Sequence, residues 1–232
     1  MNRYHITLGV SLPVLLAAAQ AAPWRDTPVA RLEALALIQT LNGELLASSS
    51  ATRTLEQWCR THALAEPAQL VARQIPASPA EPGAVVRAHL QVGADEPVRS
   101  RRVELRCGEH LLAVADNWYV PARLTPSMNR SLETTQLPFG KVVESLSPQR
   151  QTLAVTLLWS PLPEGWERAA APIRPLPDTA AEPLGIPAAL FAHQAIVFNS
   201  QHQPLAEVHE VYQRDLLDFP EPGLSAPQPQ GN

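Results

Sequence analysis

Apolar residues near the start of the chain recur at the spacing of a helix. Asp26-Thr27-Pro28 provides a capping residue followed by proline at the first helical position. Apolar side chains then follow every three or four residues, at Val29, Leu32, Leu35, Ile38, Leu41 and Leu45. This pattern predicts a first helix, and a second is expected from about Thr52 to His62.

Beyond residue 68 the chain has mostly short apolar runs, which are typical of strands. Seven strands are expected, over residues 69–75, 85–91, 101–107, 111–120, 152–159, 191–199 and 205–213. Turn residues at 107–110 and 199–204 predict hairpins, and a helical stretch interrupted at 137–140 is expected over 126–146. Helices followed by antiparallel hairpins indicate an α+β domain, with an antiparallel sheet and flanking helices.

One carboxylate interrupts an otherwise apolar side of the last expected strand. Alternation places Ala206, Val208, Glu210 and Tyr212 on one side, and Leu205, Glu207, His209 and Val211 on the other. Burial disfavours the charged form of a carboxylate, which prepares such a group to act as a general acid or to accept a hydroxyl. Two other interpretations of Glu210 are a strand edge turned into solvent and a partnership with an arginine.

Composition favours one soluble core and excludes an obvious nucleic-acid partner. The chain has 232 residues, of which 45% are hydrophobic and 17% charged, enough for a single domain. Its net charge is −4, and the 18 basic residues include one lysine, Lys141. They form no basic block, so no nucleic-acid binding is expected.

Residues 1–21 have the features of a secretory signal. Arg3 is followed by an uncharged apolar run, and Ala19-Gln20-Ala21 matches a cleavage site before Ala22. An uncleaved anchor is the alternative, but the run is shorter than the roughly 20 residues that a membrane span needs. We therefore expect a periplasmic or secreted protein with a domain over 22–218, a proline-rich disordered tail over 219–232, and no membrane span after cleavage.

Export affects the interpretation of the two cysteines, Cys59 and Cys107. In an oxidising compartment they could form one disulfide, and two buried free thiols are the alternative. The histidines show no spacing typical of a metal site, so no metal is expected.

Four segments, in order, resemble the chorismate pyruvate-lyase family. They are residues 50–56, the hairpin that opens at 101–107 and closes at 118–121, residues 137–140, and residues 203–212. The resemblance covers roughly residues 30–215. It implies an antiparallel sheet flanked by helices, no cofactor, and removal of pyruvate from chorismate to leave 4-hydroxybenzoate in an enclosed pocket.

The same resemblance implies a set of site residues. A carboxylate-binding arginine falls at Arg101 or Arg102, backbone amides at Phe139 and near Ala51, and a catalytic glutamate at Glu210. We prefer Arg101, because it alternates with the apolar side of its strand. Arginine stays charged and offers two donors to a carboxylate, and a glutamic acid can protonate a leaving oxygen.

Two departures leave a second function open. The signal segment conflicts with a cytoplasmic substrate, and Phe139 replaces the small aliphatic residue usual in the family. The chain is therefore either a lyase acting on chorismate or a related enolpyruvyl or aromatic acid, or an exported, non-catalytic domain that binds a small aromatic or other apolar carboxylate. The sequence indicates no oligomeric state.

Overall fold

The computed structural model describes residues 24–76, 81–168 and 182–222. The expected signal segment and most of the expected tail lie outside these residues. The helices are α1 (Pro28–Ala47), α2 (Ala51–Thr61), α3 (Ala84–His89), α4 (Pro126–Thr134) and α5 (Phe139–Val142). The strands are β1 (Leu70–Gln74), β2 (Arg99–Cys107), β3 (His110–Tyr119), β4 (Gln149–Leu157), β5 (Ala189–Phe198) and β6 (Pro204–Gln213).

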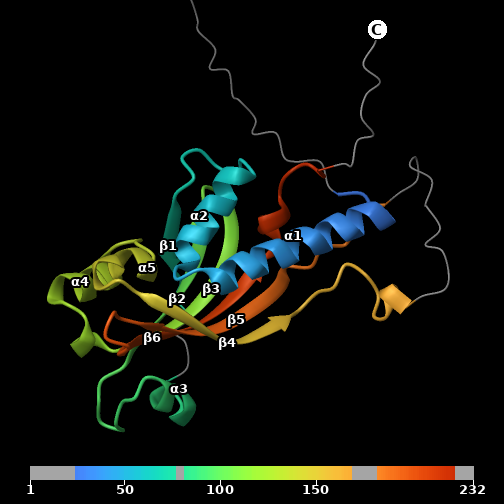
Figure 1. The fold of residues 1–232 in the computed structure, drawn as a ribbon. Coiled ribbons are helices and arrows are strands. Elements are labelled where there is room, and N and C mark those ends of the chain that lie inside the picture. The colour runs from blue at the N-terminus through green and yellow to red at the C-terminus, as the bar shows by residue number, and fades with distance from the viewer. Residues whose placement is uncertain (1–23, 77–80, 169–181, 223–232) are drawn as a thin grey trace, which may run out of the picture.

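The six strands form one antiparallel sheet in the order β1-β2-β3-β6-β5-β4. Helices α1 and α2 pack on one face of this sheet, α4 and α5 lie together at one end of it, and α3 stands apart on its other side (Figure 1). The expected α+β class, an antiparallel sheet with flanking helices, is confirmed. Within the described ranges no helix is long and apolar enough to cross a membrane.

The two expected N-terminal helices are confirmed, and both are capped by side chains. The Thr27 hydroxyl accepts a hydrogen bond from the amide of Ala30, and the Ser50 hydroxyl accepts one from the amide of Arg53. The apolar stripe of α1 lies slightly off the expected one, because Val29 and Leu32 are exposed. The buried stripe of α1 consists of Ala30, Ala34, Ile38, Leu41 and Leu45.

The strand expected over 85–91 is wrong, since these residues form α3 and the turn after it. Val86 and Leu90 are four residues apart and both buried, so the run also satisfies the period of a helix. They pack against Trp118 and Val120 of the β3 region. A short apolar run fits either period, and packing under the sheet selects the helix.

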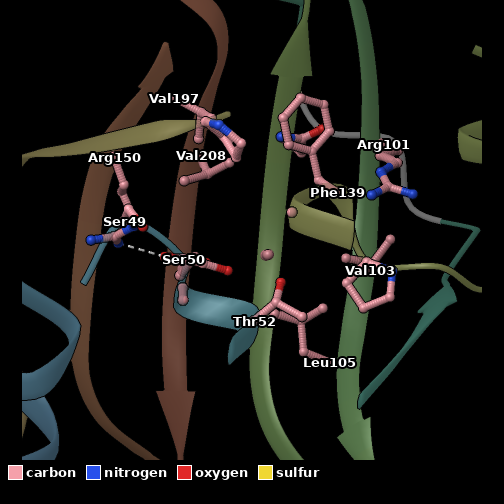
Figure 2. Close-up of a pocket in the computed structure, with 17 residues that line it drawn as sticks. Ser49, Ser50, Thr52, Arg101, Val103, Leu105, Phe139, Arg150, Val197 and Val208 are labelled. Carbon is pink, nitrogen blue, oxygen red and sulfur yellow. Dashed lines mark hydrogen bonds and ion pairs between the residues drawn. The ribbon is translucent and has the colours of Figure 1, made fainter. Parts of the chain in front are cut away.

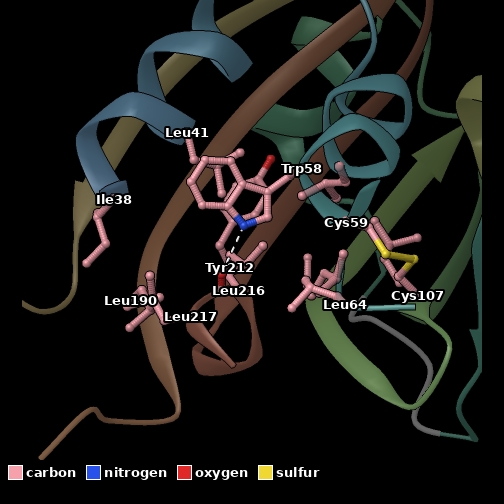
Figure 3. Close-up of a cluster of buried hydrophobic side chains, with 14 of the residues drawn as sticks. Ile38, Leu41, Trp58, Cys59, Leu64, Cys107, Leu190, Tyr212, Leu216 and Leu217 are labelled. Carbon is pink, nitrogen blue, oxygen red and sulfur yellow. Dashed lines mark hydrogen bonds between the residues drawn. A yellow bond between two sulfur atoms is a disulfide. The ribbon is translucent and has the colours of Figure 1, made fainter. Parts of the chain in front are cut away.

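A disulfide joins α2 to the sheet. Cys59 and Cys107 are bonded, which confirms the first of the two interpretations of the cysteines, and their Cα atoms lie 6.6 Å apart. Nearby, the indole Nε1 of Trp58 donates to the carbonyl of Leu216 at 2.9 Å (Figure 3). These two links fix α2 above β2, and so fix the beginning of α2 over the centre of the sheet.

Two contacts between residues that are distant in the sequence constrain the fold. Gly108 turns the β2–β3 hairpin with a φ of +56°, and a Cβ there would lie 2.7 Å from the Cβ of Ala65, so glycine is required. At the other end of the chain the indole of Trp24 donates to the carbonyl of Phe219 at 3.0 Å, and both side chains are buried. The packed domain therefore continues through Phe219.

Candidate functional site

A small pocket lies between the sheet and the beginnings of α2 and α5. Its cavity measures about 60 Å³. The walls are mostly apolar side chains of the sheet, namely Val103, Leu105, Ala115, Val197 and Val208. Residues 49–52, residues 138–140 and Pro148 cover it (Figure 2).

Arg101 occupies one end of this pocket, on β2. It is 5% exposed, and its Nη1 donates a long hydrogen bond to the carbonyl of Leu132 at 3.5 Å. Its Nε atom is buried without a partner, and no carboxylate of the described residues pairs with it. Burial lowers the pKa of Arg101 to about 10, and Tyr119 opposes this shift only in part. Arg101 therefore remains a cation at neutral pH, without a counter-ion in the described part of the chain.

Arg102 points to the opposite side of the sheet. Its side chain is 40% exposed and lies 3.6 Å from the carboxylate of Asp116. Alternation along β2 separates the two neighbours, because residues i and i+1 of a strand face opposite sides. The arginine preferred from the sequence is thus the one that lines the pocket.

Arg150 occupies the other end of the pocket, on β4, and the sequence did not identify it. The strand was expected to begin at residue 152, whereas β4 begins at Gln149 and brings Arg150 opposite Val197 of β5. β2 and β4 are separated in the sheet by three strands, and the two arginines lie at opposite sides of the close-up (Figure 2).

Arg150 pairs with Glu210, the carboxylate that the strand pattern singled out. Nη2 of Arg150 donates to Oε2 of Glu210 at 2.7 Å, and the two side chains are only 3% and 7% exposed. The hydroxyl of Tyr212 donates to the same oxygen at 2.9 Å. Burial by itself lowers the pKa of Arg150, but the charges of Glu210 and Tyr212 and the hydrogen bond to Glu210 together outweigh it and raise the pKa.

These contacts match the interpretation of Glu210 as a carboxylate with an arginine partner. An ion-paired carboxylate accepts hydrogen bonds and has no proton to donate. The geometry around Glu210 therefore stabilises a charge, and does not prepare a general acid.

His193 lies beside this pair. Its Nε2 is 2.8 Å from Oδ1 of Asn42, and its Nδ1 is 3.4 Å from Nη2 of Arg150. Burial lowers the pKa of His193 to about 4, and the positive charge of Arg150 adds to the effect while Glu210 opposes it. At neutral pH the imidazole is neutral, so Nε2 donates to Asn42 and Nδ1 accepts from Arg150.

Asn117 is a second pocket residue that the sequence did not identify as functional. It is 2% exposed, it lines the cavity, and it lies directly opposite Arg101 in the β2–β3 register. Neither its Nδ2 nor its Oδ1 has a hydrogen-bond partner among the described residues. Its position on the same side of β3 as Ala115 could have drawn attention to it, since a buried amide on an apolar face needs partners.

Ala51 and Phe139 begin α2 and α5, and both line the pocket at 8% exposure. The two helix ends meet closely, because a Cβ on Gly140 would lie 2.9 Å from Oγ1 of Thr52. Outside this contact a larger cavity of about 490 Å³ shares Thr52 and Gly140 with the inner pocket. The inner pocket therefore adjoins a wider outer basin at the contact between α2 and α5.

Glu207, on the other side of β6, is also buried. Its carboxylate accepts hydrogen bonds from His89, Gln194 and His209 at 2.7–2.9 Å, and its side chain is 0% exposed. Burial raises the pKa of Glu207, but these hydrogen bonds, led by that from His209, lower it overall. Both sides of β6 therefore hold a satisfied buried carboxylate. In the part of the chain that the structure describes, no three His, Cys, Asp or Glu side chains could hold a metal ion.

Comparisons with solved structures return transcriptional regulators at low similarity. YydK from Bacillus subtilis has a TM-score of 0.39 and 15% identity, over 68% of this chain and 63% of that one. The effector domain of PhnF from Mycobacterium smegmatis has a TM-score of 0.41 and 14% identity, over 72% and 90%. A GntR-family transcriptional regulator from Enterococcus faecalis V583 has a TM-score of 0.37 and 12% identity, over 64% and 96%.

Membership of the chorismate pyruvate-lyase family, expected from the four sequence segments, is wrong. No family model matches the chain, and its curated relative, described below, is an uncharacterized protein. Short segments such as Leu137-Pro138-Phe139-Gly140 fit the loops and hairpins of this sheet without specifying the reaction. The activity implied by the resemblance therefore does not carry over, and the correction leaves the α+β fold class in place.

A curated relative shows where the chain belongs. The uncharacterized protein y4mC from Sinorhizobium fredii (strain NBRC 101917 / NGR234) is 45% identical over 202 residues, which cover 87% of this chain and 84% of the relative. Identity at this level over most of both chains indicates common descent. The chain belongs to the family of the Sinorhizobium fredii protein y4mC.

Proposed function

We propose that this protein is a small-molecule-binding domain whose ligand is an organic carboxylate held by Arg101. The observation that carries the proposal is the electrostatic state of Arg101, a buried cation that no carboxylate of the described residues neutralises. A buried charge of this kind is costly unless a partner is supplied, and a ligand carboxylate would supply one.

The chemistry of the pocket supports the same ligand class. A guanidinium offers two parallel donors that match a carboxylate, and its hydrogen bonds to a charged acceptor are among the strongest in proteins. The walls beyond Arg101 are aliphatic, so they suit the apolar body of an organic acid. The far end is already neutralised by the Arg150–Glu210 pair, which favours a ligand with a single negative charge.

The size of the cavity favours a ligand smaller than an aromatic acid. A cavity of about 150 Å³ accommodates benzene, whereas this pocket measures about 60 Å³. Phe139 occupies part of the space above the sheet (Figure 2). An aromatic acid would enter only after Phe139 moves, while a short aliphatic acid requires less space.

We also propose that binding takes place outside the cytoplasm. The Cys59–Cys107 disulfide supports this location, because disulfides persist in oxidising compartments. N-terminal sequencing of the protein from fractionated cells checks it. We expect the mature chain to begin at Ala22 in the periplasmic or secreted fraction, and an intact Met1 in the cytosol would contradict it.

A ligand titration followed by NMR tests the binding function. Wild-type protein is titrated with propionate and butyrate, and Arg101→Met is compared with the matched surface control Arg102→Met. Loss of a charged hydrogen bond costs about 1.5–3 kcal/mol, so Arg101→Met should weaken both ligands roughly 10- to 150-fold. The control should change affinity less than about 2-fold, as expected of a half-exposed pair. Equal, small losses in the two variants would contradict the proposal.

A further inference from the structure

We propose that the ligand is a short-chain 2-hydroxycarboxylate, and that Asn117 recognises its 2-hydroxyl group. This inference rests on the proposed binding of a carboxylate by Arg101 and specifies the ligand class further. Asn117 is the residue that carries it, because it lines the cavity and neither polar atom of its amide has a partner in the described part of the chain.

The amide of Asn117 has two unmet requirements. Nδ2 is a donor and Oδ1 is an acceptor, and both are buried with no hydrogen bond to the described residues. Leaving a buried donor or acceptor unsatisfied costs about 1–3 kcal/mol. A ligand that satisfies both atoms therefore gains more than a ligand that satisfies one.

The strand register places this amide next to the proposed carboxylate site. Arg101 and Asn117 are directly opposite each other in the β2–β3 ladder. Side chains at such positions leave Cβ atoms about 4.5–5.5 Å apart. We infer that the group contacted by Asn117 is a neighbour of the carboxylate that Arg101 holds.

A 2-hydroxycarboxylate has the complementary groups at that spacing. Nδ2 of Asn117 would donate to a carboxylate oxygen, while Oδ1 accepts from the 2-hydroxyl. A 2-oxo acid presents only acceptors at these positions, so Oδ1 would stay unsatisfied. An unsubstituted acid leaves the same atom unsatisfied.

The remaining walls limit the rest of the ligand. Val208 lies opposite Asn117 on its other side, in the β3–β6 register, and presents an apolar surface. The cavity of about 60 Å³ leaves room for a short alkyl group only. Because Arg150 and Glu210 already satisfy each other, a second ligand charge has no partner there.

Three acids that differ only at carbon 2 test the inference. Propionate, pyruvate and each enantiomer of lactate are titrated into wild-type protein and into Asn117→Leu, which keeps the branching of the side chain but removes both polar atoms. One lactate enantiomer should bind wild type at least about 10-fold more tightly than propionate or pyruvate. Asn117→Leu should bind all three acids more weakly, because it loses the donor to the carboxylate, and it should lose the preference for lactate over propionate.

The outcomes separate this inference from the function on which it rests. If wild type binds propionate, pyruvate and lactate equally and Arg101→Met weakens all three, the carboxylate function holds and the role of Asn117 is overturned. A lactate preference that survives in Asn117→Leu also overturns it. If none of the ligands binds wild type, the proposed function itself fails. The comparison within wild type decides the ligand class even if the variant does not fold.

Discussion

The two ends of the pocket contain the same side chain in opposite electrostatic surroundings. Arg150 lies 2.7 Å from Glu210 and its pKa is raised, while Arg101 has no acidic partner in the described residues and its pKa is lowered to about 10. Both guanidinium groups are buried. The protein thus completes one end of the pocket with its own residues and leaves donors unsatisfied at the other.

This difference indicates which end interacts with other molecules. A sequence that folds well satisfies its buried polar groups, and the exceptions concentrate at functional positions. Three of these exceptions, Nε of Arg101 and both amide atoms of Asn117, lie on neighbouring strands beside the pocket. Buried atoms of Glu33, Asp116 and Asn129 also have no hydrogen-bond partner among the described residues, and these three side chains do not line the pocket. Nε of Arg150 also has no partner in the described residues, but the charge of Arg150 is neutralised.

Disruption of the Arg150–Glu210 ion pair should have the largest effect on stability. Arg150→Met leaves Glu210 as an unpaired buried carboxylate, and we expect the free energy of unfolding to fall by about 3–5 kcal/mol. Urea denaturation followed by circular dichroism measures the change. The double variant Arg150→Met/Glu210→Leu should recover most of the loss, because no buried charge remains. A single variant as stable as wild type would show that the pair is not structural.

Removal of the disulfide should have the second-largest effect on stability. The disulfide anchors β2, the strand that contains Arg101. Cys59 and Cys107 are 48 residues apart in sequence, and closing a loop of this length stabilises a fold by about 2–4 kcal/mol. The variant Cys59→Ala/Cys107→Ala should lose that amount in urea denaturation. Amide hydrogen exchange should increase more in β2 than in β5, and equal increases in both strands would contradict this anchoring role.

The pH dependence of stability tests the surroundings of His193, which lies beside the Arg150–Glu210 pair. The pKa of His193 is about 4 in the fold and about 6.5 in an unfolded chain. Above pH 6.5 both states are neutral, and as pH falls from 6.5 to 4 the unfolded state takes up the proton first, so stability decreases. The loss from this group should be about 2–3 kcal/mol over that range.

The variant His193→Gln is the control, since it keeps a donor for Asn42 and does not titrate. Its unfolding free energy should depend less on pH than that of wild type between pH 6.5 and 4. Parallel curves for the two proteins would show that His193 does not resist protonation in the fold.

The smallest effect on stability is expected from replacing Arg101, at the other end of the pocket. Arg101→Met removes a buried charge that has no acidic partner in the described residues, so the ligand-free protein should become more stable by about 1 kcal/mol. Urea denaturation without added carboxylate measures it. A loss as large as that of Arg150→Met would mean that Arg101 has a structural partner, and the contrast between the two ends would disappear.

Part of this site follows from sequence pattern alone. Alternation along a strand assigns Arg101 to the inner side and Arg102 to the outer side, and the structure places them there. The same reasoning places Glu210 on the inner side. Local periodicity succeeds at these positions because it depends only on neighbours in the chain.

The remainder depends on contacts between distant segments. Arg150 and Glu210 are 60 residues apart, and only the sheet order brings β4 close to β6. Glu207 is buried because α3, which ends at His89, covers the other face of the sheet. The apolar pattern predicted a strand where α3 forms, so it could not predict this burial. Alternation along β3 could have drawn attention to Asn117, but only the folded structure shows that its amide has no partner among the described residues.

The most direct test of the central claim is the stability of wild type and Arg101→Met in the presence of a carboxylate. A ligand that binds only the folded state stabilises it by about 2.7 kcal/mol at a concentration of 100 times its Kd. Urea denaturation of wild type in increasing concentrations of lactate should show this rise, whereas Arg101→Met should show little or none over the same concentrations. If Arg101→Met is stabilised as strongly as wild type, Arg101 does not bind the carboxylate.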